Sequence, residues 1–387
     1  MRISRIKFTN FQFKKKKHRN IPLSFFNLKN LINNYKILET LTTSYKYSYS
    51  KKLLNKFKRN NFFNIIGMGG STLGAEAIYQ FLKNKTKKKF RFINNLKPNI
   101  DEKTKNTKVI NLIISKSGNT LETICNSNLL IKKKNNIFIT EKKSSYLFNL
   151  AKKLKSQVVE HKNFIGGRYS VLSEVGMLPA ELMGFNERKF KKLNYLVNNK
   201  LFIKNLITNV NFILNFAKQG KLNSIILNYD ENSENLFKWY QQLVAESLGK
   251  KSKGILPIIS TMPRDNHSLL QLYLDGPNKN FFTFFNVFEK KSAIFKETYK
   301  ESSFKYLRNK SFFEILNAQK KATQNVFRLK RIPFRSFEIY DKNEETLGEL
   351  FTFFILETIL LGKLLKVNPF DQPSVELIKE ETRKILS

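Results

Sequence analysis

The chain has 387 residues, of which 41% are hydrophobic and 13% aromatic, and its formal net charge at pH 7 is +40. This length exceeds that of one ordinary domain, and the apolar content suffices for two packed cores. The single cysteine, Cys125, excludes an internal disulfide framework and a cysteine-based zinc site. No stretch is predicted to span a membrane, and the first twenty residues do not resemble a secretory signal, so we expect a cytoplasmic protein.

The positive charge would attract any polyanion, which raises the hypothesis of a nucleic-acid partner. The lysines, however, are spread along the whole chain beside abundant Asn, Ile and Phe, a pattern that biased coding composition also produces. No aromatic and basic motif of a known nucleic-acid-binding module accompanies them. We therefore expect no specific nucleic acid and no membrane as partners, whereas small anionic substrates would be attracted by the same field.

Short apolar runs alternate with helical spacing in the first part of the chain. The pattern predicts strands at 62–66, 90–93, 109–114 and 137–139, and helices at 72–82 and 119–130. Such alternation is typical of a parallel sheet covered by helices on both faces.

A second unit of the same type begins near Lys221. It has a predicted strand at 224–227, a helix at 234–248 and a strand at 255–259. A mostly helical region at 187–219 could link the two units, and the final stretch at 344–386 is again predicted to be helical. The prediction is an α/β protein with two doubly wound parallel-sheet (α/β/α sandwich) domains and a helical C-terminal tail. Its boundaries are 1–195 for the first domain with an N-terminal extension, 196–343 for the second, and 344–387 for the tail, which packs back across the first.

A glycine-rich turn, "GMGGSTLG" at 67–74, follows the first predicted strand. Gly70 and Ser71 lie where a helix begins, so unobstructed amides there can face an anion. A dinucleotide fingerprint does not fit, because it requires glycine where Thr72 stands. The alternative is a merely tight turn, which a glycine-rich sequence also favours.

The loop after the strand at 109–114 reads "SKSGNTLET", residues 115–123. Ser115, Ser117 and Thr120 supply three hydroxyl groups, Lys116 adds a charge, and the following helix contributes its dipole, so the loop is suited to hold a phosphate. An ordinary helix cap would need only one such hydroxyl. The loop lacks the Gly-Lys-Ser/Thr ending of a nucleotide-binding loop, which favours a phosphorylated metabolite over ATP.

These two motifs, with four further stretches in the same order, resemble the glucose-6-phosphate isomerase (phosphoglucose isomerase) family, in its compact bacterial branch, within the sugar-isomerase (SIS) domain superfamily. The four stretches are "GGRYSVLSEVG" at 166–176, "QQLVAESLGK" at 241–250, "DNHSLLQLYLDGP" at 265–277 and "NPFDQPSVELIK" at 368–379. The resemblance implies two SIS-type domains and reversible interconversion of an aldose and a ketose phosphate through a cis-enediolate. Proton transfer alone accomplishes this change, so we expect no metal and no organic cofactor.

The resemblance also implies roles for individual residues. Glu246 matches the family's base, which moves a proton between adjacent carbons, and Arg168 matches the arginine that stabilises the enediolate. His267 and Lys379 match the residues that open the sugar ring, and Gln372 matches a substrate-contacting glutamine. In the family this histidine comes from the neighbouring subunit, which implies a homodimer. The other two histidines are expected to be solvent-exposed: His18 lies in a basic segment and His161 precedes a lysine.

The sequence departs from the family pattern at two residues. Glu174 stands where a small residue is usual and would need a buried partner, and Ser374 replaces a common glycine, which is acceptable with ordinary backbone angles.

Three alternative functions remain open from the sequence. They are an isomerase that also accepts mannose 6-phosphate, a non-catalytic sugar-phosphate-binding protein, and a nucleic-acid binder. The joint presence of Glu246, Arg168 and His267 favours an enzyme.

Overall fold

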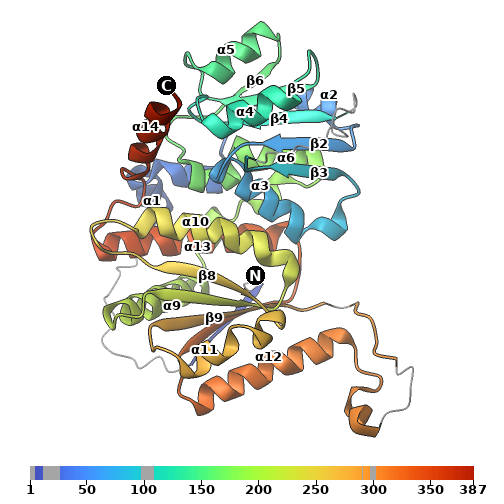
Figure 1. The fold of residues 1–387 in the computed structure, drawn as a ribbon, viewed down its shortest axis with the longest axis vertical. Coiled ribbons are helices and arrows are strands. Elements are labelled where there is room, and N and C mark those ends of the chain that lie inside the picture. Colours follow the sequence, from blue (N-terminus) through green and yellow to red (C-terminus); the bar gives the residue numbers. More distant parts are fainter. Residues whose placement is uncertain (1–4, 12–26, 97–108, 290, 297–301) are drawn as a thin grey trace.

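The structure is a computed structural model that describes residues 5–11, 27–96, 109–289, 291–296 and 302–387. Within these residues the strands form two five-stranded sheets, which Figure 1 shows in the upper and lower halves of the molecule. Mixed helices and parallel strands confirm the predicted α/β class. Among the described residues, none of the helices combines the length and the apolar character that a membrane span requires.

The first sheet has the strand order β3-β2-β4-β5-β6, and all its neighbouring strands are parallel. Its strands are β2 (Phe62–Ile66), β3 (Lys89–Ile93), β4 (Ile110–Ile114), β5 (Asn136–Thr140) and β6 (Gln157–Glu160). The residues of β4 and β5 are buried without exception, as expected for central strands covered on both faces. The connecting helices are α3 (Gly70–Phe81), α4 (Leu121–Leu130) and α5 (Tyr146–Lys153).

The second sheet has the order β1-β10-β9-β7-β8, and it is parallel except for its edge strand. It contains β1 (Ile6–Phe11), β7 (Asn223–Asn228), β8 (Leu256–Thr261), β9 (Asn280–Val287) and β10 (Phe334–Ile339). β1 pairs antiparallel with β10, so a segment from the start of the chain completes the sheet built by its second half. The exact division into domains at residues 195 and 343 stays a prediction.

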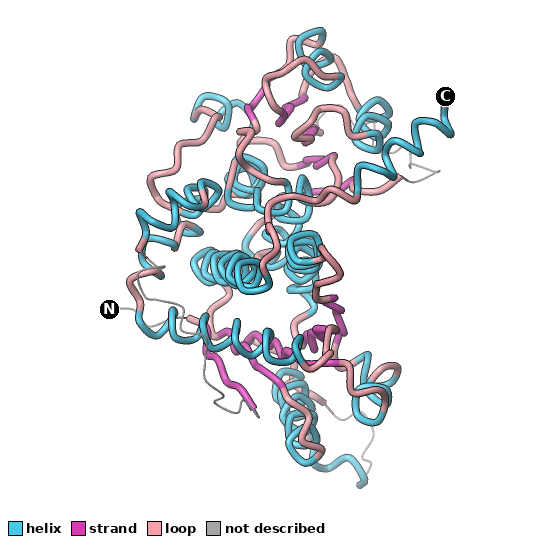
Figure 2. The backbone as a smooth tube through the Cα atoms, turned by 90° about the vertical axis from the view of Figure 1, so that its left-hand side faces the viewer, coloured by secondary structure: helices cyan, strands magenta, loops and turns pink. Residues whose placement is uncertain are grey.

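Two helices lie between the sheets, α10 (Glu234–Leu248) and α13 (Glu344–Leu365) (Figures 1 and 2). α13 is buried from Thr346 to Gly362, which explains why its sequence is apolar on nearly every side. α10 contacts α3 of the upper half, β8 of the lower half and α13. A side chain on α10 can therefore meet groups from both halves of the molecule.

A buried ion pair ties this middle layer to the lower sheet. The Arg335 guanidinium on β10 donates hydrogen bonds to the Glu357 carboxylate on α13, and the Tyr240 hydroxyl on α10 donates to the same carboxylate at 3.1 Å. Both charged side chains are at most 1% exposed. Because burial withdraws both from solvent, the pair is stable only while both members are present.

The remaining helices fill the ends and the periphery. The α-helices are α1 (Leu28–Asn34), α2 (Lys51–Phe57), α6 (Glu174–Met183), α7 (Glu187–Phe190), α8 (Leu193–Leu196), α9 (Lys200–Lys218), α11 (Leu270–Asp275), α12 (Phe312–Leu329) and α14 (Val375–Leu386). Short 3-10 turns include η2 (Lys36–Leu41), η5 (Gly167–Leu172) and η7 (Arg264–His267). No residue of α14 is buried, although Leu377, Ile378 and Ile385 lie on it.

The predicted need of Glu174 for a buried partner is confirmed. Its carboxylate, fully buried at the start of α6, accepts hydrogen bonds from the Tyr45 hydroxyl at 2.9 Å and from the backbone amide of Ser48 at 2.9 Å. Lys162 lies 4.0 Å away. Ser374 has φ −69° and ψ −21°, ordinary helical angles that need no glycine.

Candidate active site

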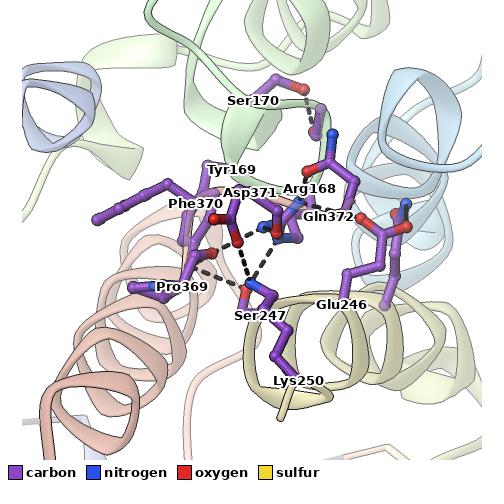
Figure 3. A network of polar contacts seen from close by, with 12 residues as sticks. Arg168, Tyr169, Ser170, Glu246, Ser247, Lys250, Pro369, Phe370, Asp371 and Gln372 are labelled. Atoms are coloured by element: carbon purple, nitrogen blue, oxygen red, sulfur yellow. Dashed lines mark hydrogen bonds and ion pairs between the residues drawn. The ribbon is translucent and has the colours of Figure 1, made fainter. Parts of the chain in front are cut away.

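Arg168 is the centre of a polar cluster at the point where both halves of the molecule meet (Figure 3). Its side chain is 2% exposed, and every nitrogen of its guanidinium is engaged. Nε donates to Ser247 Oγ at 2.8 Å, and Nη2 donates to the carbonyl oxygens of Pro369 and Asp371 at 2.7 and 3.0 Å. Nη1 donates to Glu246 Oε2 at 3.1 Å and to Gln372 Oε1 at 2.7 Å. The cation is therefore held in one orientation.

Glu246, on the last turn of α10, is the carboxylate of this cluster. One oxygen accepts from Arg168, and the other accepts from Gln242 Nε2 at 2.9 Å, one helical turn earlier. The Glu246 side chain is still 32% exposed, so a small molecule can reach it. An oriented, ionised carboxylate beside a fixed cation can accept a proton from a ligand while the cation stabilises the resulting negative charge.

The glycine-rich turn lies against this cluster for a steric reason. A Cβ atom on Gly70 would lie 2.2 Å from the Gly167 carbonyl group, next to Arg168, so only glycine allows this close approach. Gly69 has φ +53°, and a Cβ there would lie 2.8 Å from Gln242 Nε2. The turn thus brings α3 against both the arginine segment and α10, and Ser71 follows directly on α3.

The predicted phosphate loop leaves the carboxyl end of β4. Ser115 Oγ lies 2.8 Å from Thr120 Oγ1 and accepts a hydrogen bond from the amide of Gly118, which has φ +69°. Ser117 is exposed, and Lys116 Nζ donates to the carbonyl oxygen of Asn163 at 2.7 Å. Burial lowers the pKa of Lys116 from its ordinary value.

A cavity of about 270 Å³ joins this loop to the surroundings of Arg168. Lys116 borders it on one side, and Tyr169 and Phe370, the neighbours of the arginine cluster, border it on another. The structure thus brings together Arg168, Glu246, Gln372 and Gly70, and it places the loop at 115–120 nearby.

Two predicted residues do not join the cluster within this chain. His267 is exposed on η7, and no hydrogen bond with a described residue engages it. Lys379 lies on α14 with a side chain that is 60% exposed, and its Nζ pairs with Glu376 at 2.6 Å. Within the described residues neither side chain contacts Arg168 or Glu246.

The expectation for His161 is wrong, because this side chain is only 2% exposed. It directly follows β6, and its Nδ1 lies 3.2 Å from the carbonyl oxygen of Lys162. His18 lies outside the described residues. Sequence reasoning also missed Gln242 and Ser247. Their positions four residues before and one residue after Glu246, on the same helix, are the signal that could have indicated them.

Comparison with known proteins gives a consistent result. A family model described as phosphoglucose isomerase matches residues 54–256. The glucose-6-phosphate isomerase of Methanocaldococcus jannaschii is 32% identical, covering 84% of this chain and 84% of its own. That of Mycoplasmopsis pulmonis is 34% identical, covering 83% of this chain and 82% of its own.

Solved structures agree in fold. A hypothetical protein from Thermus thermophilus superposes with a TM-score of 0.79 at 23% identity, covering 95% of this chain and 92% of that one. A glucose-6-phosphate isomerase from Chlamydia trachomatis gives 0.72 at 17% identity, covering 97% and 80%. Taken with the arrangement around Arg168, the sequence matches lead to one conclusion: this chain belongs to the phosphoglucose isomerase family.

Proposed function

We propose that the chain interconverts glucose 6-phosphate and fructose 6-phosphate at the Arg168 cluster. The observation that carries this proposal is the single guanidinium that contacts both Glu246 and Gln372, because it joins a proton acceptor and a sugar-binding amide around one fixed cation. Family membership supports the same reaction, as do the related glucose-6-phosphate isomerases of Methanocaldococcus jannaschii and Mycoplasmopsis pulmonis.

In this mechanism Glu246 removes the proton from C2 of the open-chain aldose, and the electron pair of the broken C–H bond forms the C1=C2 bond of the enediolate. The C1 oxygen takes the negative charge, which lies beside Arg168. The hydroxyl proton then passes from the C2 oxygen to the C1 oxygen, and Glu246 returns its proton to C1 as C2 becomes the carbonyl carbon. Arginine keeps its own proton at any physiological pH, so it stabilises the anion without protonating it. The reverse sequence converts the ketose into the aldose.

The phosphate group is assigned to Ser115, Lys116, Ser117 and Thr120, and the sugar to Gly70, Ser71 and Gln372. Hydroxyl groups, a lysine and the start of α4 are together suited to a dianion. The cavity beside Lys116 and Tyr169 supports this placement, since it lies between the loop and the arginine cluster.

Ring opening is assigned to His267 and Lys379, with His267 supplied by the neighbouring subunit of a homodimer. The exposure of His267 supports this proposal, since the side chain is free to meet a second chain. The uncovered apolar residues of α14 are compatible with a further contact there. A cytoplasmic location belongs to the same proposal.

The test is the conversion of fructose 6-phosphate by the wild-type protein and by Glu246→Gln, which keeps the shape of the side chain but removes its basicity. We expect kcat to fall by about 10³-fold, because loss of a general base has effects of this order. Glu234→Gln, at the other end of α10, is the control and should retain full activity.

Two results would change the assignment. Full activity in Glu246→Gln would show that Glu246 is not the general base. A wild-type protein that binds fructose 6-phosphate without converting it would favour the non-catalytic sugar-phosphate-binding protein. Turnover of mannose 6-phosphate in a parallel assay would extend the activity to the broader isomerase.

A further inference from the structure

A second and larger cavity lies at the carboxyl ends of β5 and β6. It has a volume of about 700 Å³ and is lined by the segments that follow these two strands, 141–143 and 160–164, and by Lys36 of η2. The cavity lies on the carboxyl-end side of the sheet, where ligands of open α/β sheets bind, but beside the edge strand β6 and not at the switch point between β2 and β4. None of the residues assigned to the substrate above lines this cavity, although Lys116 contacts two lining residues, Glu141 and Asn163.

The lining carries more positive than negative charge. Four lysines, Lys36, Lys142, Lys143 and Lys162, face two glutamates. The glutamates are already engaged: Glu141 lies 2.5 Å from Lys143 and Glu160 lies 3.4 Å from Lys142. Among the described residues no carboxylate pairs with Lys36, whose Nζ lies 4.8 Å from the centre of the Phe164 ring. The surplus charge suits an anion.

His161 adds a possible hydrogen-bond acceptor to the cavity, which the binding of an anion alone would not require. This ring is 2% exposed and lines the cavity, and its Nδ1 lies 3.2 Å from the carbonyl oxygen of Lys162. Burial lowers the pKa of His161 from its ordinary value, which disfavours the charged ring. In the tautomer whose Nδ1–H donates to that carbonyl, Nε2 is the acceptor, and no described residue donates a hydrogen bond to it. A ligand hydroxyl can donate to this nitrogen.

The cavity adjoins the active site without being part of it. Lys36, Asn163 and Phe164 border both this cavity and the smaller one beside Tyr169. The segment between the two cavities, which contains Asn163 and Phe164, leads along the chain to Arg168.

We propose that this cavity binds a second ligand, a phosphate ester that carries free hydroxyl groups and is not the substrate. Lys36, Lys142 and Lys143 contact its phosphate, and His161 Nε2 accepts a hydrogen bond from one of its hydroxyl groups. The site differs from the phosphate loop in kind, because lysines and an imidazole replace serine and threonine hydroxyls and the start of a helix.

Calorimetric titration with glycerol 3-phosphate tests this proposal, since this probe has a phosphate and two hydroxyls but no carbonyl group to isomerise. Two sites per chain are expected, the phosphate loop and the new cavity. Ser115→Ala/Ser117→Ala, in the phosphate loop, should weaken binding at the first site and leave the second unchanged. Lys142→Gln/Lys143→Gln should weaken the second at least about tenfold, because each removes a charge-assisted contact.

The control is Lys310→Gln/Lys321→Gln, which removes the same charge from exposed positions near α12. Equal weakening by both double variants would mean that only the overall charge attracts the probe and would overturn the proposal. A single site that Lys142→Gln/Lys143→Gln leaves unchanged would overturn it as well. Neither outcome depends on isomerase activity.

His161→Phe separates the hydroxyl contact from the charge. With circular dichroism confirming the fold, this variant should bind glycerol 3-phosphate about fivefold more weakly at the second site and bind inorganic phosphate as the wild type does, since one hydrogen bond of about 1 kcal/mol is lost. An equal change for both probes would contradict the assigned role of the imidazole.

Discussion

At the scale of single residues, the properties of Arg168 follow from the geometry of its side chain. A planar guanidinium presents five N–H groups in fixed directions, and here they meet two side chains of α10, one glutamine and two backbone carbonyl groups. The same cation therefore orients Glu246 and fastens the chain segment that carries Gln372. We therefore expect both catalysis and the local stability of this segment to depend on Arg168.

The variant Arg168→Lys distinguishes the effect of the positive charge of residue 168 from the effect of its hydrogen-bond arrangement. Lysine keeps the positive charge but cannot reach the carbonyl groups of Pro369 and Asp371 together with Glu246. We expect kcat/KM for fructose 6-phosphate to fall about 10²- to 10³-fold, the size of effect seen when a charge-stabilising donor is lost. Amide hydrogen exchange at 368–374 should accelerate in parallel. Unchanged exchange there would mean that Arg168 does not hold this segment.

At the scale of elements, a buried lysine connects η2, η5 and α7. Lys191 Nζ donates to the carbonyl oxygens of Thr40 and Leu172 and lies 4.9 Å from the centre of the Tyr47 ring. Burial lowers the pKa of Lys191 to about 7. The unfolded chain, with an ordinary lysine pKa near about 10.4, binds more protons than the folded protein between these two values.

The free energy of unfolding should therefore rise with pH through this window. The contribution of Lys191 is at most about 1.4 kcal/mol per pH unit, and the penalty for protonation is complete below about pH 7. Urea unfolding at pH 7.0, 8.0 and 9.0 should show a rise for the wild type that Lys191→Met lacks. Parallel curves for the two proteins would show that Lys191 titrates normally in the folded state.

The Arg335–Glu357 pair gives a second prediction at this scale. Replacing Glu357 by Gln leaves a buried, uncompensated cation, which is expected to cost about 3 to 5 kcal/mol of unfolding free energy. The double variant Arg335→Met/Glu357→Leu removes both charges and should recover most of that loss. Thermal unfolding of the single and double variants measures the difference. A double variant less stable than Glu357→Gln would contradict this account.

The same elements show what sequence patterns can predict. β2 and α10 have the predicted limits because an unbroken apolar run and a regular helical period are local signals. β10 was not predicted, since Arg335 interrupts its apolar pattern and the partner that makes this charge tolerable lies 22 residues away. The sequence pattern does not predict α6, because Gly176 and Pro179 lie within it and these residue types normally end helices. Such positions are decided by tertiary contacts.

The candidate active site, like the secondary structure, could be predicted from the sequence only in part. Motif resemblance indicated Arg168, Glu246 and Gln372 together, and the structure brings them into contact. Motif resemblance alone did not indicate Gln242, whereas its spacing of four residues from Glu246 on the predicted helix could have done so. His267 and Lys379 remain proposals, since a single chain does not bring them to Arg168.

At the scale of the whole molecule, the proposed homodimer makes a quantitative prediction. His267→Gln and Glu246→Gln should each be inactive alone. If His267 acts across the interface, a mixed dimer has one site with both native residues, and random reassociation of equal amounts restores about a quarter of the wild-type activity. Co-refolding followed by an assay measures this, with each variant refolded alone as control. Persistent inactivity would place His267 within its own chain's site or outside catalysis.

The distance along the chain between the partners of Arg168 has a consequence for synthesis. Arg168 and Gln372 are 204 residues apart, and Asp371 and Pro369, which accept from the same guanidinium, are equally late. β1, near the start of the chain, likewise cannot pair until β10 has been synthesised, because residue 6 pairs with residue 339. During translation the upper sheet can form early, but its arginine lacks these partners until the segment after α13 emerges from the ribosome. The polar cluster around Arg168 is therefore complete only after residues 369–372 have been made, and a chain that stops at residue 365 has Glu246 without the segment whose carbonyl groups accept from Arg168.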